Sequence, residues 1–375
     1  MRLVSIYNCE AGLKIAKPIY DDQNRVLLNE GATLTDSILN RLKSKGISHI
    51  YAQTDLTEGI IKNDDVPHTL RFETTKSMVK VFNSLSSDLN SKVAAATHGK
   101  LLREFKLVYG QLVKEMKYNA HLLNLLTHLQ ANSDYLFEHS MNVSIYSLAI
   151  ARQLYINEDD MYVLGLGAIF HDIGKIKLER DLLHKKAKFT EEEKATMRTH
   201  AELGFELLRK ERELHLLISH CAYQHHENID GSGYPRGLKD KEIHLFAKII
   251  GVADMFDSLM RNRREKKALL PHEAMEVLWG YCYKRYDKKI LDAFIKSVAL
   301  YPIGVTVTLN TGEKGVVVGY NDNFPQRPVI RVYTDTKGNK LQEPHDVDML
   351  KHLSIMIEQC DAILDEGKIE RGATA

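Results

Sequence analysis

The chain lacks paired cysteines, long hydrophobic runs and an excess of charge of either sign. Its four cysteines lie far apart and form no C-x-x-C pair, so we expect reduced thiols of a cytoplasmic protein. No stretch approaches the roughly 18 apolar residues of a membrane span, and we expect neither a signal peptide nor a membrane partner. The 51 basic and 50 acidic side chains nearly cancel, which excludes a broad basic surface for polymeric nucleic acid.

Proline is scarce in the middle of the chain, where residues 70–300 contain only Pro235 and Pro271. Apolar residues recur there with the helical period, which predicts an all-helical domain. Residues 1–60 alternate short apolar runs with turns and include Thr35 as a helix N-cap, which predicts a small α+β module. The sequence predicts a mostly α protein whose flanking parts are this module, a small β-rich module at 302–350, and a short helix and tail at 351–375.

Histidine is concentrated in the helical region, since 12 of the 17 histidines fall between His121 and His272. Histidine usually serves a local purpose as ligand, acid, base or hydrogen-bonding group. The imidazoles and carboxylates of this region suit iron, zinc, manganese and similar ions. They occur as His139, His171-Asp172, His200, His225-His226 and Asp254.

The pair His171-Asp172 follows an apolar helical run, Leu164 to Phe170. At the end of such a helix the imidazole can bind one metal ion while the carboxylate bridges to a second. Two ions about 3.5 to 4 Å apart can hold an attacking hydroxide and neutralise a phosphoryl oxygen.

Each of these residues also has an ordinary structural interpretation. His139 and His200 could be packed or solvated, Asp254 could cap a helix, and His225-His226 could be a chance pair. The ordered set is more informative than any member.

Three long motifs occur in this order: HDIGK at 171–175, HHENIDGSGYPRGL at 225–238 and GVADMFDSLM at 251–260. Together they resemble the HD-GYP family of the HD metal-dependent phosphohydrolases. The resemblance spans roughly residues 130 to 285. It implies a helical HD-type domain and hydrolysis of a cyclic dinucleotide, of which cyclic di-GMP is the first expectation.

The resemblance also implies a role for each matching residue. Asp172 is expected to bridge the metals and Lys175 to contact the scissile phosphate as catalytic groups. Tyr234, Arg263 and Lys266 match positions that contact the dinucleotide, together with Lys175. The implied metal ligands are His139, His171, Asp172, His200, His225, His226 and Asp254.

The sequence departs from the family pattern at two informative places. Tyr135 stands where some relatives carry a carboxylate for a third metal, so we expect two divalent ions. Iron or manganese is expected first, with zinc and cobalt as alternatives. The usual Arg-Pro-Tyr-Arg segment reads Arg263-Arg264-Glu265-Lys266, which leaves the base specificity open.

The expected reaction is attack of a metal-bridging hydroxide on a 3′-5′ phosphodiester of a cyclic dinucleotide. Two alternatives stay open. One is an HD phosphohydrolase that acts on another nucleotide, and the other is a non-catalytic cyclic-dinucleotide receptor. A homodimer or a signalling-protein partner is compatible with either activity.

Overall fold

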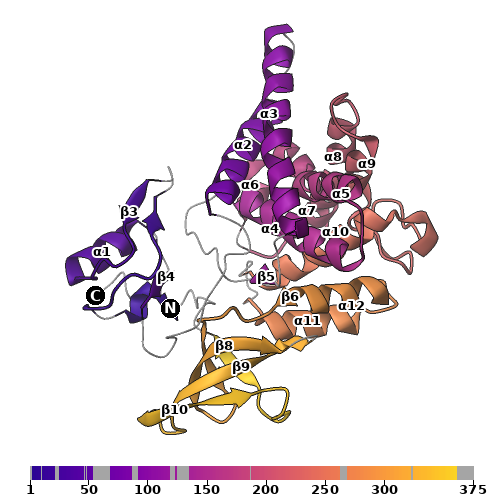
Figure 1. Cartoon of the computed structure of the whole chain (residues 1–375). Helices are drawn as coiled ribbons and strands as arrows, with labels where there is room; N and C mark the ends of the chain where they lie inside the picture. The colour runs from indigo at the N-terminus through magenta and orange to yellow at the C-terminus, as the bar shows by residue number, and fades with distance from the viewer. Residues whose placement is uncertain are drawn as a thin grey trace. The chain divides into compact units, whose positions relative to one another are not determined.

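The computed structural model describes the chain over residues 2–9, 11–21, 25–45, 47, 49–53, 68–86, 92–118, 123–124, 135–185, 187–261, 268–321 and 324–360. The chain divides into two compact units. The first contains residues 1–64, 124–133 and 298–375, and the second contains residues 65–123 and 134–297. Figure 1 shows the helices of the second unit and the strands of the first.

The N-terminal part of the first unit is a small α+β structure, as its alternating apolar runs indicated. Strand β1 (Arg2–Ser5) pairs antiparallel with β4 (His49–Ala52), and β2 (Ile19–Tyr20) pairs with β3 (Val26–Leu28). A 3₁₀ turn, η1 (Ile6–Asn8), follows β1. Helix α1 (Asp36–Ser44) begins at the predicted cap, where the Thr35 hydroxyl accepts a hydrogen bond from the Ile38 amide.

The C-terminal part of the first unit is a five-stranded antiparallel sheet in the order β10-β9-β8-β7-β11. Alternate side chains of its central strands point into a buried core. Hydrogen bonds from β1 connect this sheet and the residues just before it to the N-terminal segment. The Leu3 amide donates to the Gly304 carbonyl at 2.8 Å, and Arg2 Nε donates to Thr306 Oγ1 at 2.7 Å. The strands are β7 (Thr306–Leu309), β8 (Lys314–Asn321), β9 (Phe324–Thr334), β10 (Lys340–Asp348) and β11 (Ile357–Cys360).

The prediction of a short helix in residues 351–375 is wrong for the part of that segment that the structure describes. Residues Ile357–Cys360 form strand β11, which pairs with the edge of β7. Ile357 and Cys360 are buried in the sheet, and Cys360 lies opposite Val307. The open hydrogen-bonding edge of β7 decides the conformation, and local sequence could not reveal that edge. Residues 361–375 lie outside the described part of the chain.

The second unit is almost entirely helical, which confirms the mostly α prediction. The C-terminal half of the apolar helix α5 lies in the interior of this unit, where every residue from Leu164 to Phe170 is buried. Helices α2 and α3 form a long antiparallel pair beside it (Figure 1). No helix in the described ranges is sufficiently long and apolar to cross a bilayer.

The elements of this unit have the following bounds: α2 (His68–Ser86), α3 (Lys92–Tyr118), α4 (Tyr135–Gln153), α5 (Glu158–Phe170), η3 (Ile173–Lys177), α6 (Arg180–His184), α7 (Glu191–Arg198), α8 (His200–Leu208), α9 (Leu216–Gln224), η4 (Asp240–Glu242), α10 (Leu245–Leu259), α11 (Pro271–Gly280) and α12 (Lys288–Ser297). The short strands β5 (Leu123–Asn124) and β6 (Val298–Ala299) pair with each other. Each lies at a point in the sequence where the chain passes from one unit to the other.

Candidate metal centre

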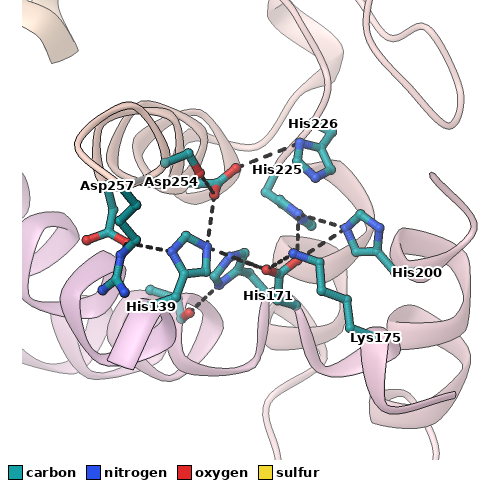
Figure 2. Close-up of polar contacts among 12 residues, drawn as sticks. His139, His171, Lys175, His200, His225, His226, Asp254 and Asp257 are labelled. Atoms are coloured by element: carbon teal, nitrogen blue, oxygen red, sulfur yellow. Dashed lines mark hydrogen bonds and ion pairs between the residues drawn. The ribbon is translucent and has the colours of Figure 1, made fainter. Parts of the chain in front are cut away.

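The seven residues expected as metal ligands converge at one place inside the helical unit (Figure 2). They come from the second turn of α4, the interior of α10, the start of α8, and the residues that directly follow α5 and α9. Six of the seven side chains are at most 13% exposed, so the cluster lies below the protein surface. The residues are His139, His171, Asp172, His200, His225, His226 and Asp254.

Asp172 lies at the centre of the cluster, and its two carboxylate oxygens face different histidines. Oδ2 is 3.5 Å from His139 Nε2 and 3.4 Å from His171 Nε2. Oδ1 is 3.3 Å from His200 Nε2 and 3.8 Å from His225 Nε2. The carboxylate therefore separates the histidines into two sets, as a bridging ligand requires.

The remaining ligand atoms complete two groups that are each suitable for one ion. Within each group, the candidate atoms all lie within 4.8 Å of one another. Asp254 belongs to the first, where its Oδ1 is 3.1 Å from His139 Nε2. His226 belongs to the second, and its Nδ1 is 3.9 Å from Asp254 Oδ2. The groups are His139, His171 and Asp254, and Asp172, His200, His225 and His226.

Backbone carbonyls orient three of the imidazoles. His171 Nδ1 donates to the Ala168 carbonyl at 2.6 Å, and His200 Nδ1 donates to the Met197 carbonyl at 2.6 Å. His225 Nδ1 donates to the Ala222 carbonyl at 2.9 Å. Since a carbonyl only accepts, the proton resides on Nδ1, and each Nε2 directs its lone pair into the cluster.

Burial keeps the histidines of the second group neutral. It lowers the pKa of His200, lowers the pKa of His225 well below its usual value, and lowers the pKa of His226 to about 3. Although burial opposes ionisation of Asp172, the Lys175 ammonium holds the pKa of that carboxyl well below its usual range. Neutral imidazoles around an ionised carboxylate are the forms that bind metal ions.

Two buried atoms of the cluster lack a hydrogen-bond partner within the described residues: His171 Nε2 and Asp172 Oδ1. Buried polar atoms are almost always satisfied, and leaving one unsatisfied costs about 1 to 3 kcal/mol. Both atoms are electron-pair donors aimed into the cluster. The donor set, its burial and these atoms all fit divalent metal ions.

Asp257 is a site residue that the sequence analysis missed. It is 2% exposed, and its Oδ2 accepts a hydrogen bond from His139 Nδ1 at 2.7 Å. It lies three positions after Asp254 on α10, so the two carboxylates lie on one helix face. That spacing was available in the sequence and could have identified Asp257 as the residue that orients His139.

Lys175 lies in η3, one turn after Asp172, and its ammonium donates to Asp172 Oδ2. The lysine side chain is 17% exposed, whereas Asp172 is 1% exposed. The ammonium therefore stands at the boundary between the buried cluster and solvent. This is a suitable place for a cation that meets the phosphate of an incoming ligand.

Tyr234 covers the second group of histidines from the side of the loop after α9. Its ring stacks on His226 with centroids 4.6 Å apart, and the Arg198 guanidinium lies over the same ring, 5.2 Å from its centroid. A Cβ atom on Gly233 would stand 2.4 Å from the Asn228 amide nitrogen, so only glycine allows this approach. Arg198 is exposed at the end of α7, and the sequence analysis did not select it.

Two predicted substrate contacts, Arg263 and Lys266, lie outside the described residues, which omit 262–267. Tyr135 is the first residue of α4, and its side chain is likewise outside the described part.

The family comparisons agree with this geometry. Residues 124–290 match the HD domain, and residues 306–366 match a KOW domain associated with HD domains. The chain is 32% identical over 224 residues to a cyclic di-GMP phosphodiesterase of Pseudomonas aeruginosa, with 59% of this chain and 53% of that protein covered. Residues 124–290 therefore form an HD domain, the domain that the HD-GYP motifs indicated. The resemblance drawn from the motifs is thereby confirmed.

Two further relatives of the HD-GYP domain differ in the substrate that they are named for. A cyclic di-GMP phosphodiesterase of Thermotoga maritima is 34% identical over 185 residues, which cover 48% of this chain and 50% of that protein. A 3′3′-cGAMP-specific phosphodiesterase of Vibrio cholerae is 33% identical over 186 residues, which cover 50% of this chain and 40% of that protein. The chain spans about half the length of the curated relatives it matches, or less.

Proposed function

We propose that this protein is a metal-dependent phosphodiesterase that hydrolyses a cyclic dinucleotide, with cyclic di-GMP as the first candidate. The observation that carries the proposal is Asp172, whose two oxygens face two separate groups of buried ligand atoms. Divalent ions held there would lower the pKa of water and neutralise charge on phosphoryl oxygens. Relatives of the domain that are named for cyclic dinucleotides support the substrate class.

The protein's own groups would position the scissile phosphate. The Lys175 ammonium lies against Asp172 and is partly exposed, so it can donate to a phosphate oxygen as negative charge develops there. The seven ligand residues would hold the ions, and Asp257 would keep the His139 ring in place through its Nδ1 hydrogen bond.

Tyr234 and Arg198 would form one wall of the substrate site. The stack of His226, Tyr234 and Arg198 extends from the ligand cluster to the exposed end of α7. A cyclic dinucleotide carries a second phosphate beyond the scissile one, and that phosphate requires a cation. Within the described residues, no carboxylate lies within ion-pair distance of the Arg198 guanidinium, and a planar guanidinium can bind phosphate through two hydrogen bonds.

The decisive experiment measures turnover of cyclic di-GMP and 3′3′-cGAMP by the purified, metal-loaded protein, with and without a chelator. Hydrolysis that the chelator abolishes and added metal restores is the expected result. Binding without turnover would establish a receptor instead. Turnover of other nucleotides alone would establish the alternative HD phosphohydrolase, and chromatography of the products would show whether one or both phosphodiester bonds are cleaved.

Metal analysis should give close to two divalent ions per chain, with iron or manganese first and zinc or cobalt as alternatives. Each of the two groups holds enough donors for one ion, and Asp172, a member of the second group, also faces the first group through its Oδ2 and could bridge the two ions. The measurement is elemental analysis of protein that is purified without oxygen. A reproducible value near three would require a ligand beyond the two groups, and a value near one would contradict the bridging role of Asp172.

Replacing Arg198 by alanine should raise the KM for the dinucleotide about tenfold or more, with an unchanged metal content. Loss of a hydrogen bond to a charged group costs roughly 1.5 to 3 kcal/mol, which is about tenfold to a hundredfold in binding. Arg209 is a matched control because its guanidinium also lies over an aromatic ring, 5.7 Å from the centroid of Phe205. It directly follows the C-terminal end of α8, whereas His200 begins that helix. If both alanine variants keep the wild-type KM, Arg198 is not a substrate contact.

A further inference from the structure

Helix α2 precedes the segment that matches the HD domain, yet one of its side chains belongs to a hydrogen-bonded chain that ends at the metal centre. Arg71 donates through one guanidinium nitrogen to Asn142 Oδ1 at 2.7 Å. Asn142 Nδ2 donates to Asp257 Oδ1 at 2.9 Å. Asp257 Oδ2 in turn accepts from His139 Nδ1 at 2.7 Å. Three successive hydrogen bonds thus join α2, α4 and α10 to a candidate ligand.

The chemistry of each member fixes the direction of this chain. The Arg71 guanidinium has only donors, so Asn142 must turn its amide oxygen toward α2. Its amide NH₂ group then faces Asp257, whose carboxylate only accepts. If the Asn142 amide turned over, its oxygen would face the Asp257 carboxylate and its NH₂ group would face the guanidinium. Both contacts would then be repulsive.

Asp257 has little freedom to adopt another position. It is 2% exposed, and its Oδ2 also accepts a hydrogen bond from Arg261 Nε at 2.7 Å. A buried carboxylate is stable only when its oxygens are satisfied. Loss of the Asn142 contact would leave Asp257 Oδ1 short of a donor and allow the carboxylate to rotate. The His139 ring would then lose the acceptor that orients its Nδ1.

Burial lowers the pKa of Arg71 to about 10, which is still well above neutral pH. The guanidinium therefore stays charged while it contacts Asn142, and charge-assisted hydrogen bonds are roughly twice as strong as neutral ones.

We propose that Arg71 is a positioning residue that makes the metal centre depend on the placement of α2. Arg71 acts through Asn142 and Asp257 on His139 and touches neither the ions nor the substrate. A displacement of α2 along or around its axis would break the Arg71–Asn142 contact and weaken metal binding at His139. Its effect on turnover rests on the proposed function, whereas its effect on metal affinity does not.

The test titrates Mn²⁺ into metal-free full-length protein and measures the dissociation constant for wild type, Arg71→Gln and Arg71→Lys. Removal of a residue that supports a metal ligand typically lowers metal affinity about tenfold to a hundredfold. We expect Arg71→Gln to be about tenfold weaker, because two residues, Asn142 and Asp257, lie between it and His139. The lysine variant keeps a charged donor and should recover part of the loss. Lys80→Gln is the control, since this exposed side chain lies on the same helix.

A double-variant comparison distinguishes positioning from a general loss of packing. Asn142→Leu removes the intermediate group, so adding Arg71→Gln to it should weaken Mn²⁺ binding no further. Wild-type affinity in Arg71→Gln, or losses that multiply in the double variant, would overturn the proposal. If Arg71→Gln unfolds, the same comparison is made with Arg71→Lys. Wild-type protein that binds Mn²⁺ but hydrolyses no cyclic dinucleotide would contradict the proposed function and leave this test intact.

Discussion

Replacing Asp172 by asparagine should reduce turnover of the dinucleotide at least about a thousandfold and remove most of the bound metal. The carboxylate lies at the centre of the cluster and faces both groups of ligand atoms, with Oδ1 toward His200 and Oδ2 toward His139. Asparagine has nearly the same shape, but it offers one neutral oxygen in place of two charged ones. An ion that polarises a phosphoryl group contributes several kcal/mol, and about 4 kcal/mol corresponds to a thousandfold in rate.

The substitution also changes the balance of charge in the site. Lys175 donates to Asp172 Oδ2 and is 17% exposed, so in the variant it would stand against a neutral amide. Asp159→Asn is the matched control, because it makes the same chemical change on the exposed first turn of α5. The measurements are kcat and metal content for both variants. Near-normal turnover with two ions bound in Asp172→Asn would rule out the bridging arrangement.

The candidate ligands could be predicted from the sequence because their chemistry is local. His171-Asp172 follows a uniformly apolar helix, and His225-His226 precedes a loop rich in glycine. The motifs therefore indicated both the residue types and the helix ends that carry them. The structure brings these side chains together as expected, while their binding of metal stays a prediction.

Features that depend on distant neighbours could not be predicted in this way. Residues Ile357–Cys360 read as a short helix because nothing nearby reveals the open edge of β7, with which they pair. The contact between Arg71 and Asn142 joins residues 71 positions apart, and no periodicity within either helix indicates it. Arg198 was missed for a similar reason, since its partner Tyr234 lies on a separate loop.

At Gly174, the backbone of η3 lies very close to the backbone of α8. A Cβ atom at this position would lie 1.9 Å from the His200 carbonyl oxygen and 2.6 Å from the Gly204 amide nitrogen. Both are backbone atoms of α8, so no side-chain rotation can relieve the contact. The helix that begins with the candidate ligand His200 would have to move away from η3.

Replacing Gly174 by alanine should therefore weaken both the fold and the metal centre. Overpacking a buried site usually costs about 1 to 3 kcal/mol, and we expect the upper end because the backbone must shift. For a unit of this size, a loss of about 3 kcal/mol lowers Tm by roughly 6 to 12 °C. Mn²⁺ affinity should fall as well, since His200 Nε2 lies only 3.3 Å from Asp172 Oδ1 and would move with α8.

Gly280→Ala is the matched control for this substitution. Gly280 ends α11, and a Cβ atom there would meet nothing within 4 Å. Since alanine favours a helix over glycine by up to about 1 kcal/mol, this variant should unfold at the wild-type temperature or slightly above it. The two variants are compared by thermal unfolding and by Mn²⁺ titration of the metal-free protein. Equal Tm and equal affinity in both would show that α8 moves away from η3 at little cost. The close contact at Gly174 would then not be what holds His200 against Asp172.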